Sequence, residues 1–280
     1  MIDTKRMLPI AVVMLAAAGP AWAQQAAPTA APAPAPATGT SVAPAAAADD
    51  TDDLIPGTIA GTAALTSDYM FRGISQTDNN PAIQASLEYS YDTGFYGITP
   101  YLGFWGSNVD FNDNDTATVE VDTLFGFRGD LLDTGVTWDL GGIYYAYPGA
   151  SRNGGQATNY DYWEIPVKLS YSPVEDLITV GASYYYSPDY FGATGKANYV
   201  NGSLTVTPPV PYVDLALFGA VGYQNIEDTK DYVDWTLGGK VTFKGVDFTI
   251  AYVDTNLTQS DLGGQKLSDA RVVFTVGAAF

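Results

Sequence analysis

Two residue types are missing from this sequence, which contains no cysteine and no histidine. Without cysteine no disulfide can form, so an exported chain of this kind must gain its stability elsewhere. Without histidine the sequence lacks the usual general base and the commonest metal ligand, which excludes Ser-His-Asp and Cys-His catalysis and the usual zinc sites. We therefore expect a protein that is not an enzyme and that holds no cofactor and no metal.

Basic residues are scarce and long apolar runs are absent. Lys and Arg together number 12 against 31 Asp and Glu, so we expect this acidic chain to repel nucleic acid. No stretch reaches roughly 18 consecutive apolar residues, so we expect no transmembrane helix. The chain has few charges overall but 20 Tyr, 12 Phe and 29 Gly, which is typical of a β-protein with an apolar outer surface.

The first residues have the features of a secretory signal peptide. Lys5 and Arg6 precede an apolar stretch, and Ala21-Trp22-Ala23 is a small-x-small cleavage site, so residues 1–23 are predicted to be removed after export. Residues 24–56 are rich in Ala and Pro and end in an acidic cluster, which predicts an extended periplasmic linker. A linker that threads through the folded domain is the alternative. Residues 57–280 form the predicted folded domain.

Twelve segments of that domain alternate apolar and polar residues, the pattern of a β-strand with one apolar face. In one of them Val121 and Phe125 oppose Glu120 and Asp122. Most segments have about the 9–11 residues that a tilted strand needs to cross a bilayer. The predicted strands are Thr58–Arg72, Ala82–Tyr91, Phe95–Trp105, Thr118–Asp130, Val136–Tyr147, Tyr160–Tyr171, Ile178–Ser187, Ala197–Thr207, Tyr212–Gln224, Asp231–Phe243, Val246–Asp254 and Ala270–Phe280.

The connections distinguish a membrane barrel from a soluble sandwich, which also alternates. Short turns such as Lys244-Gly245 alternate with long loops such as Thr255–Asp269, as in outer-membrane barrels. Because hydrocarbon offers no hydrogen-bond partners, a spanning sheet must close on itself. We predict an all-β fold, a closed antiparallel transmembrane β-barrel of about 12 strands with both termini in the periplasm. Aromatic girdles are expected at Tyr89, Tyr91, Phe95 and Tyr96 on one rim and at Tyr144, Tyr145, Tyr147, Tyr160 and Trp163 on the other.

Several segments resemble the TorF-family porins, a group of outer-membrane barrels in Gram-negative bacteria. The most specific segment is Leu65–Thr77, and the likeness covers roughly residues 57–280. The resemblance implies passive diffusion through the outer membrane, and it supplies no site residues. The segments that carry it are Leu65–Thr77, Pro81–Gln84, Gly94–Gly97, Trp105–Phe111, Tyr144–Gly149, Asp161–Glu164 and Tyr186–Phe191.

Charged residues on the inward faces are the candidate functional residues, because rings of charge in a narrow tube set a barrier for ions. Eight acids against five bases predict a narrow lumen with a mild preference for cations. Cross-strand ion pairs without a role in selectivity are the alternative, and so is a structural barrel with a closed lumen. The candidates are Asp68, Arg72, Glu88, Glu120, Asp122, Arg128, Glu164, Lys168, Asp214, Asp234, Lys240, Asp247 and Arg271.

The expected partners follow from this location. The last predicted strand ends on an aromatic residue, Phe280, which resembles the assembly signal of outer-membrane barrels, so we expect contact with the barrel-assembly machinery. Lipid, lipopolysaccharide and small solutes or ions are the other expected partners. Asp110–Asp115 begins like a calcium-binding loop, but Asp115 stands where that loop needs Gly and Val121 where it needs Glu. A solvated outer loop is the favoured interpretation of that segment.

Overall fold

A computed structural model describes residues 56–280 except 96, 114–115, 132–133, 153–155 and 158. The predicted signal peptide, all but the last residue of the predicted linker, and Tyr96 of the predicted girdle lie outside the described residues.

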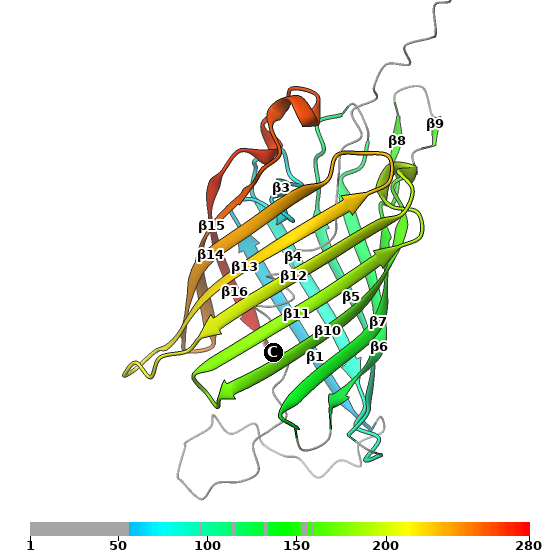
Figure 1. Ribbon diagram of the computed structural model, residues 1–280. Helices are drawn as coiled ribbons and strands as arrows, with labels where there is room; N and C mark the ends of the chain where they lie inside the picture. The colour runs from blue at the N-terminus through cyan, green and yellow to red at the C-terminus, as the bar shows by residue number, and fades with distance from the viewer. Residues whose placement is uncertain (1–55, 96, 114–115, 132–133, 153–155, 158) are drawn as a thin grey trace, which may run out of the picture.

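The described chain forms one closed antiparallel barrel of twelve strands, as the sequence predicted (Figure 1). Each barrel strand pairs with the barrel strands before and after it in the sequence, and β1 pairs with β16 to close the ring. Two small hairpins are not part of the barrel sheet. The barrel strands are β1 (Thr58–Thr66), β4 (Ala82–Ser90), β5 (Thr99–Asn108), β6 (Val119–Asp130), β7 (Val136–Ala146), β10 (Tyr162–Val174), β11 (Ile178–Ser187), β12 (Ala197–Val206), β13 (Asp214–Ile226), β14 (Tyr232–Phe243), β15 (Val246–Thr255) and β16 (Arg271–Ala279).

The pairing of β1 with β16 closes the barrel. Its register runs from Thr62 opposite Ala279 to Thr66 opposite Thr275. Beyond β16, the backbone N–H of Phe280 donates to the carbonyl of Gly61 at 3.0 Å, and the N–H of Gly61 donates back at 2.8 Å. The terminal aromatic residue therefore forms the last pair of the seam, and closure leaves no free sheet edge along these strands.

The two faces of the sheet differ as the alternation predicted. Leu237 is 69 % exposed and Phe274 is 58 % exposed on the outside, whereas Glu120 and Asp122 are fully buried on the inside. The outer surface is thus apolar and the inner surface carries the charges, which is the arrangement of a membrane barrel and the reverse of a soluble one.

The two ends of the barrel are unlike. Short connections join strands at the end that carries the start of β1 and the end of β16, which we call the short-turn rim. Longer segments join them at the other end, the loop rim, with three 3₁₀ helices and a small hairpin of β8 (Ser151–Arg152) and β9 (Gln156–Ala157) (Figure 1). The 3₁₀ helices are η2 (Phe191–Ala193), η3 (Gln259–Leu262) and η4 (Lys266–Ser268). Within the described residues, no helix has the length and apolarity to cross a bilayer.

The first strand is shorter than predicted. The sequence predicted a strand over Thr58–Arg72, but β1 ends at Thr66 and the chain then turns into the barrel. Residues 70–75 of this inward-turning segment form a second small hairpin, β2 (Met70–Phe71) and β3 (Ile74–Ser75), which lies inside the barrel near the loop rim (Figure 1). The two residues between them, Arg72 and Gly73, both have positive φ (43° and 81°), as in a type I′ turn. We call residues 68–77 the lumen hairpin.

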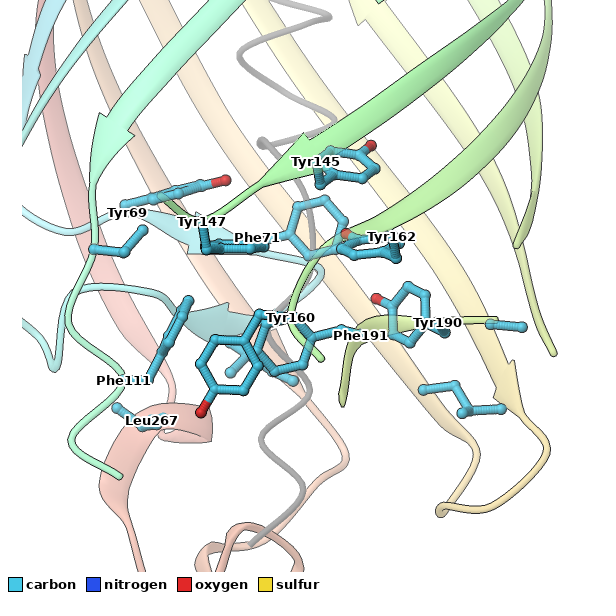
Figure 2. Packing of buried hydrophobic residues seen from close by; sticks show 14 of the residues in the cluster. Tyr69, Phe71, Phe111, Tyr145, Tyr147, Tyr160, Tyr162, Tyr190, Phe191 and Leu267 are labelled. Carbon is cyan, nitrogen blue, oxygen red and sulfur yellow. The ribbon is translucent and has the colours of Figure 1, made fainter. Parts of the chain in front are cut away.

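The prediction of an aromatic girdle at the loop rim is wrong for three of its five residues. Tyr145, Tyr147 and Tyr160 are buried inside the barrel, where they join a cluster with Phe111 and Phe191 (Figure 2). These rings fill the space around the lumen hairpin and pack edge to face or stacked. Of the other two residues, Trp163 is 45 % exposed on the outside, and Tyr144 packs against it with ring centroids 4.6 Å apart.

Candidate functional site

The lumen hairpin bears one positively charged side chain, Arg72, which reaches the opposite wall of the barrel. Its guanidinium donates to Glu164 of β10 at 2.8 Å and to Gln224 of β13 at 2.6 Å. Both side chains of the Arg72–Glu164 ion pair are 1 % exposed. A buried ion pair is retained when its geometry is good and further hydrogen bonds complete it, and here Tyr145 donates its hydroxyl to the same carboxylate oxygen at 3.1 Å.

Aromatic rings enclose the same guanidinium. It lies 4.0 Å from the ring centroid of Tyr199 and 4.5 Å from that of Phe71. The Tyr199 ring lies against Gly222 of the next strand, where an added Cβ would come within 2.1 Å of its hydroxyl. Stacked rings attract a guanidinium and shield it from water, so Arg72 is held by charge, hydrogen bonds and stacking together.

Asp68 fastens the base of the lumen hairpin to the barrel seam. Its carboxylate accepts hydrogen bonds from Ser75 at 2.6 Å and Thr77 at 3.0 Å, which close the hairpin on itself. It also pairs with Arg271 of β16 at 2.6 Å. At the tip, an added Cβ on Gly73 would lie 2.7 Å from the Thr255 side chain of β15, so the tip packs against the strand next to β16.

Three further carboxylates lie on the wall around the lumen hairpin. Glu120 accepts a hydrogen bond from the Tyr69 hydroxyl at 3.0 Å, and Asp234 accepts one from Tyr199 at 3.1 Å. The second oxygen of each, and both oxygens of Asp122, have no hydrogen-bond partner of ordinary geometry among the described residues. Together with Glu164 these side chains make four buried acids around the lumen hairpin.

The half of the lumen near the short-turn rim is different. Glu88 pairs with Arg128, and these side chains are 33 % and 26 % exposed. Lys240 pairs with Asp247 at 3.3 Å and is likewise partly exposed. The charges in this half are therefore partly exposed, whereas Arg72, Glu164, Glu120 and Asp122 beside the lumen hairpin are buried.

The thirteen predicted candidates thus fall into three groups. Eight form four ion pairs: Arg72–Glu164, Arg128–Glu88, Lys240–Asp247 and Arg271–Asp68. Glu120, Asp122 and Asp234 are the buried acids described above. Lys168 is half-buried on the inner face, and Asp214 is exposed at the short-turn rim.

Two of these candidates reach the lumen by a different route from the predicted one. Asp68 and Arg72 were placed on the inner face of a long first strand, but they lie on the lumen hairpin. The prediction missed Tyr69, Tyr199 and Gln224, because it considered charged residues alone. The signal available in the sequence was Arg72-Gly73 flanked by apolar residues, a dipeptide that suits a two-residue hairpin turn.

The loops at the loop rim are also tied together. Lys230 of the β13–β14 loop donates to Asp261 of the β15–β16 loop at 2.7 Å. This hydrogen bond, with a second from Thr258, lowers the pKa of Asp261 to about 2. The loop stays negatively charged at any physiological pH.

A closed antiparallel barrel with an apolar outside and a charged, ring-filled inside belongs to the class of membrane β-barrels. Residues 51–280 match the model of the family described as "Bacterial protein of unknown function (Gcw_chp)", and the chain belongs to that family. The resemblance to the TorF-family porins stays a prediction, since the family model that matches is a different one.

Solved structures of outer-membrane proteins resemble the chain at low sequence identity and with TM-scores below 0.5. The KdgM porin is 9 % identical with a TM-score of 0.44, and the match covers 79 % of this chain and 97 % of that one. An outer-membrane channel from Pseudomonas putida F1 is 10 % identical with a TM-score of 0.45, covering 83 % and 100 %. LpxR from Salmonella typhimurium is 9 % identical with a TM-score of 0.41, covering 79 % and 99 %. No curated protein matches the chain.

Proposed function

We propose that this chain is a porin of the bacterial outer membrane, a narrow channel that lets small solutes or ions diffuse passively and mildly prefers cations. The lumen hairpin forms its constriction. The protein is exported by a cleaved signal peptide, its short-turn rim faces the periplasm, and its loop rim meets lipopolysaccharide. It catalyses no reaction.

The observation that carries the channel proposal is the set of unpartnered polar atoms inside the barrel. Buried polar groups are nearly always hydrogen-bonded to protein or to water, so a group of them along one passage indicates water there. They include both oxygens of Asp122, one of Glu120 and one of Asp234, together with the hydroxyls of Tyr147 and Tyr190. Because the carboxylates among them outnumber the cations, the passage favours positive ions.

A second candidate function is a structural or interaction barrel with a closed lumen. It is favoured by the packing of the loop-rim half, where the lumen hairpin and its aromatic cluster are almost completely buried. In that case the loops, rather than the lumen, contact other components of the envelope.

Conductance of the purified protein in planar lipid bilayers separates the two. We expect small, discrete channel steps and, across a KCl gradient, a reversal potential that shows potassium to be more permeant than chloride. A variant in which residues 69–76 are replaced by a short Gly-Ser linker should give larger steps, because the constriction is gone. A chloride-selective current would contradict the charge argument.

The absence of steps from the full protein, with large steps from the linker variant, would favour the closed-lumen barrel. Membrane fractionation tests the location separately. We expect the protein in the outer-membrane fraction, with a mature chain that begins at Gln24, and recovery in the soluble periplasmic fraction would contradict a membrane barrel.

A further inference from the structure

Glu120 and Asp122 occupy consecutive inward positions of β6 and are the most deeply buried acids near the lumen hairpin, both with 0 % exposure. The two carboxyl groups lie within hydrogen-bonding reach of each other, and Asp122 has no other partner among the described residues. Besides Asp122, Glu120 contacts the Tyr69 hydroxyl, at 3.0 Å, and the buried Tyr147 hydroxyl, which makes no hydrogen bond of ordinary geometry.

The charge around this pair is not balanced by protein. The charged groups that act on Asp122 are two more carboxylates, Glu120 and Glu164. The nearby guanidinium of Arg72 is already bound to Glu164 and Gln224. A buried carboxylate without a partner is costly, and two at neighbouring positions repel each other as well. Either a bound cation or a proton shared by the two acids can offset this charge.

We propose that Glu120 and Asp122 bind a monovalent inorganic cation, Na⁺ or K⁺, with Tyr147 and water completing its shell. The free groups are carboxylate and hydroxyl oxygens, which suit hard cations. Over the part of the chain that the structure describes, no three acidic side chains converge as a metal-chelating group, which disfavours a divalent ion. The ion's route to the site rests on the proposed channel function, but its binding does not.

A site of this kind explains why these acids stay buried beside the constriction. A cation held there offsets one of the two negative charges and separates the two carboxylates. It also marks the position at which the channel distinguishes cations from anions, because these carboxylates attract a cation and repel an anion.

Thermal unfolding of the detergent-solubilised protein tests the proposal without any measurement of conduction. We compare NaCl and KCl with N-methyl-D-glucamine chloride at equal ionic strength and the same heating rate. A ligand that binds only the folded state at ten times its Kd raises the unfolding temperature of a domain of this size by about 2–5 °C. We expect a rise of that size with Na⁺ or K⁺ relative to the bulky organic cation.

The variants Glu120→Gln and Asp122→Asn should lose this ion-specific shift. Asp214→Asn, which removes the same charge at the exposed short-turn rim, should keep it. Folding of each variant is checked by the faster migration of an unheated barrel in SDS gels. If one of the two variants does not fold, the shift in the other decides whether the ion binds at this pair.

Equal unfolding temperatures in all three salts would overturn the proposal and assign the missing charge to a proton shared by the two acids. An equal shift in Glu120→Gln, Asp122→Asn and the wild type would overturn it too, because the ion would bind elsewhere. If the barrel conducts cations but shows no ion-specific shift, the proposed function stands and the proposed cation site is wrong. If it shows the shift but does not conduct, the cation site stands and the proposed channel function is wrong.

Discussion

At the scale of single residues, Arg72 is the side chain on which most of the lumen contacts converge. It lies in the left-handed region of backbone conformation, which a non-glycine residue adopts only when its surroundings hold it there. An ion pair, a hydrogen bond to Gln224 and a stacked Tyr199 ring supply that hold. Arg72 therefore connects the lumen hairpin to strands far from it in the sequence.

Arg72→Met tests this role. It leaves Glu164 buried without its cation, and breaking such a pair from one side costs about 3–5 kcal/mol. We expect a loss of that size in the free energy of unfolding, measured with urea in detergent micelles. The double variant Arg72→Met/Glu164→Gln should recover a large part of it, because neither charge is then left alone. Equal losses in the single and double variants would show that the ion pair is not what matters.

Gly222 tests the stacking in the same way. A Cβ at this position would overlap the Tyr199 ring and displace it from the guanidinium, so Gly222→Ala should cost about 1–3 kcal/mol of stability. Gly202 faces outward on the neighbouring strand and has open space around it, so Gly202→Ala is the matched control, with an effect within about 0.5 kcal/mol. Similar losses of stability in the two variants would contradict the inference that Gly222 leaves space for the Tyr199 ring.

At the scale of the element, the lumen hairpin is a short piece of sheet that the barrel wall completes. Its stem is closed by Asp68, and its tip packs against Thr255 and Asp254 of β15. A two-stranded hairpin is marginally stable on its own, so its shape depends on these wall contacts. The element can therefore leave its place only by breaking them.

Gly73→Ala separates wall contact from backbone conformation. Both Gly73 (φ 81°) and Gly149 (φ 80°) have left-handed geometry, but a Cβ on Gly149 meets nothing within 4 Å, whereas one on Gly73 meets Thr255 at 2.7 Å. Gly149→Ala should cost about 1 kcal/mol from conformation alone. Gly73→Ala should cost about 1–3 kcal/mol more and should raise single-channel conductance, since the tip is pushed off the wall. Equal effects in the two variants would mean that the tip does not press on the wall.

At the scale of the whole molecule, stability depends on a closed sheet whose apolar face meets lipid. Leu237 lies near the middle of β14 and is 69 % exposed on that face. Leu237→Arg should cost about 2–4 kcal/mol, because a charge at the bilayer midplane loses its hydration. Leu131, 51 % exposed in the connection after β6, gives the control, and Leu131→Arg should cost about 0–1 kcal/mol. Refolding into lipid vesicles across a urea series measures both, and an equal cost would contradict a membrane-spanning barrel.

The sequence also determined several features of the molecule before its structure was known. The alternation of Val121 and Phe125 with Glu120 and Asp122 is a local property, so it predicted which face of β6 points inward. The number of strands and the pattern of short and long connections followed from the same local signals. Apart from Asp214 at the exposed rim, the charged candidates lie inside the barrel, but their partners were not predicted and their role in selectivity stays a prediction.

Only the tertiary structure decided what fills the lumen. The segment Ser67–Thr77 reads as the end of one strand and the start of an outer loop, and nothing local shows that it turns inward. Its position depends on Glu164, Gln224 and Tyr199, which lie about 90 to 150 residues away along the chain. Local periodicity predicts the wall of a barrel because the alternation within each strand shows which residues face inward and which face outward. The contents of the barrel depend on contacts between distant strands, which meet only after the sheet has closed.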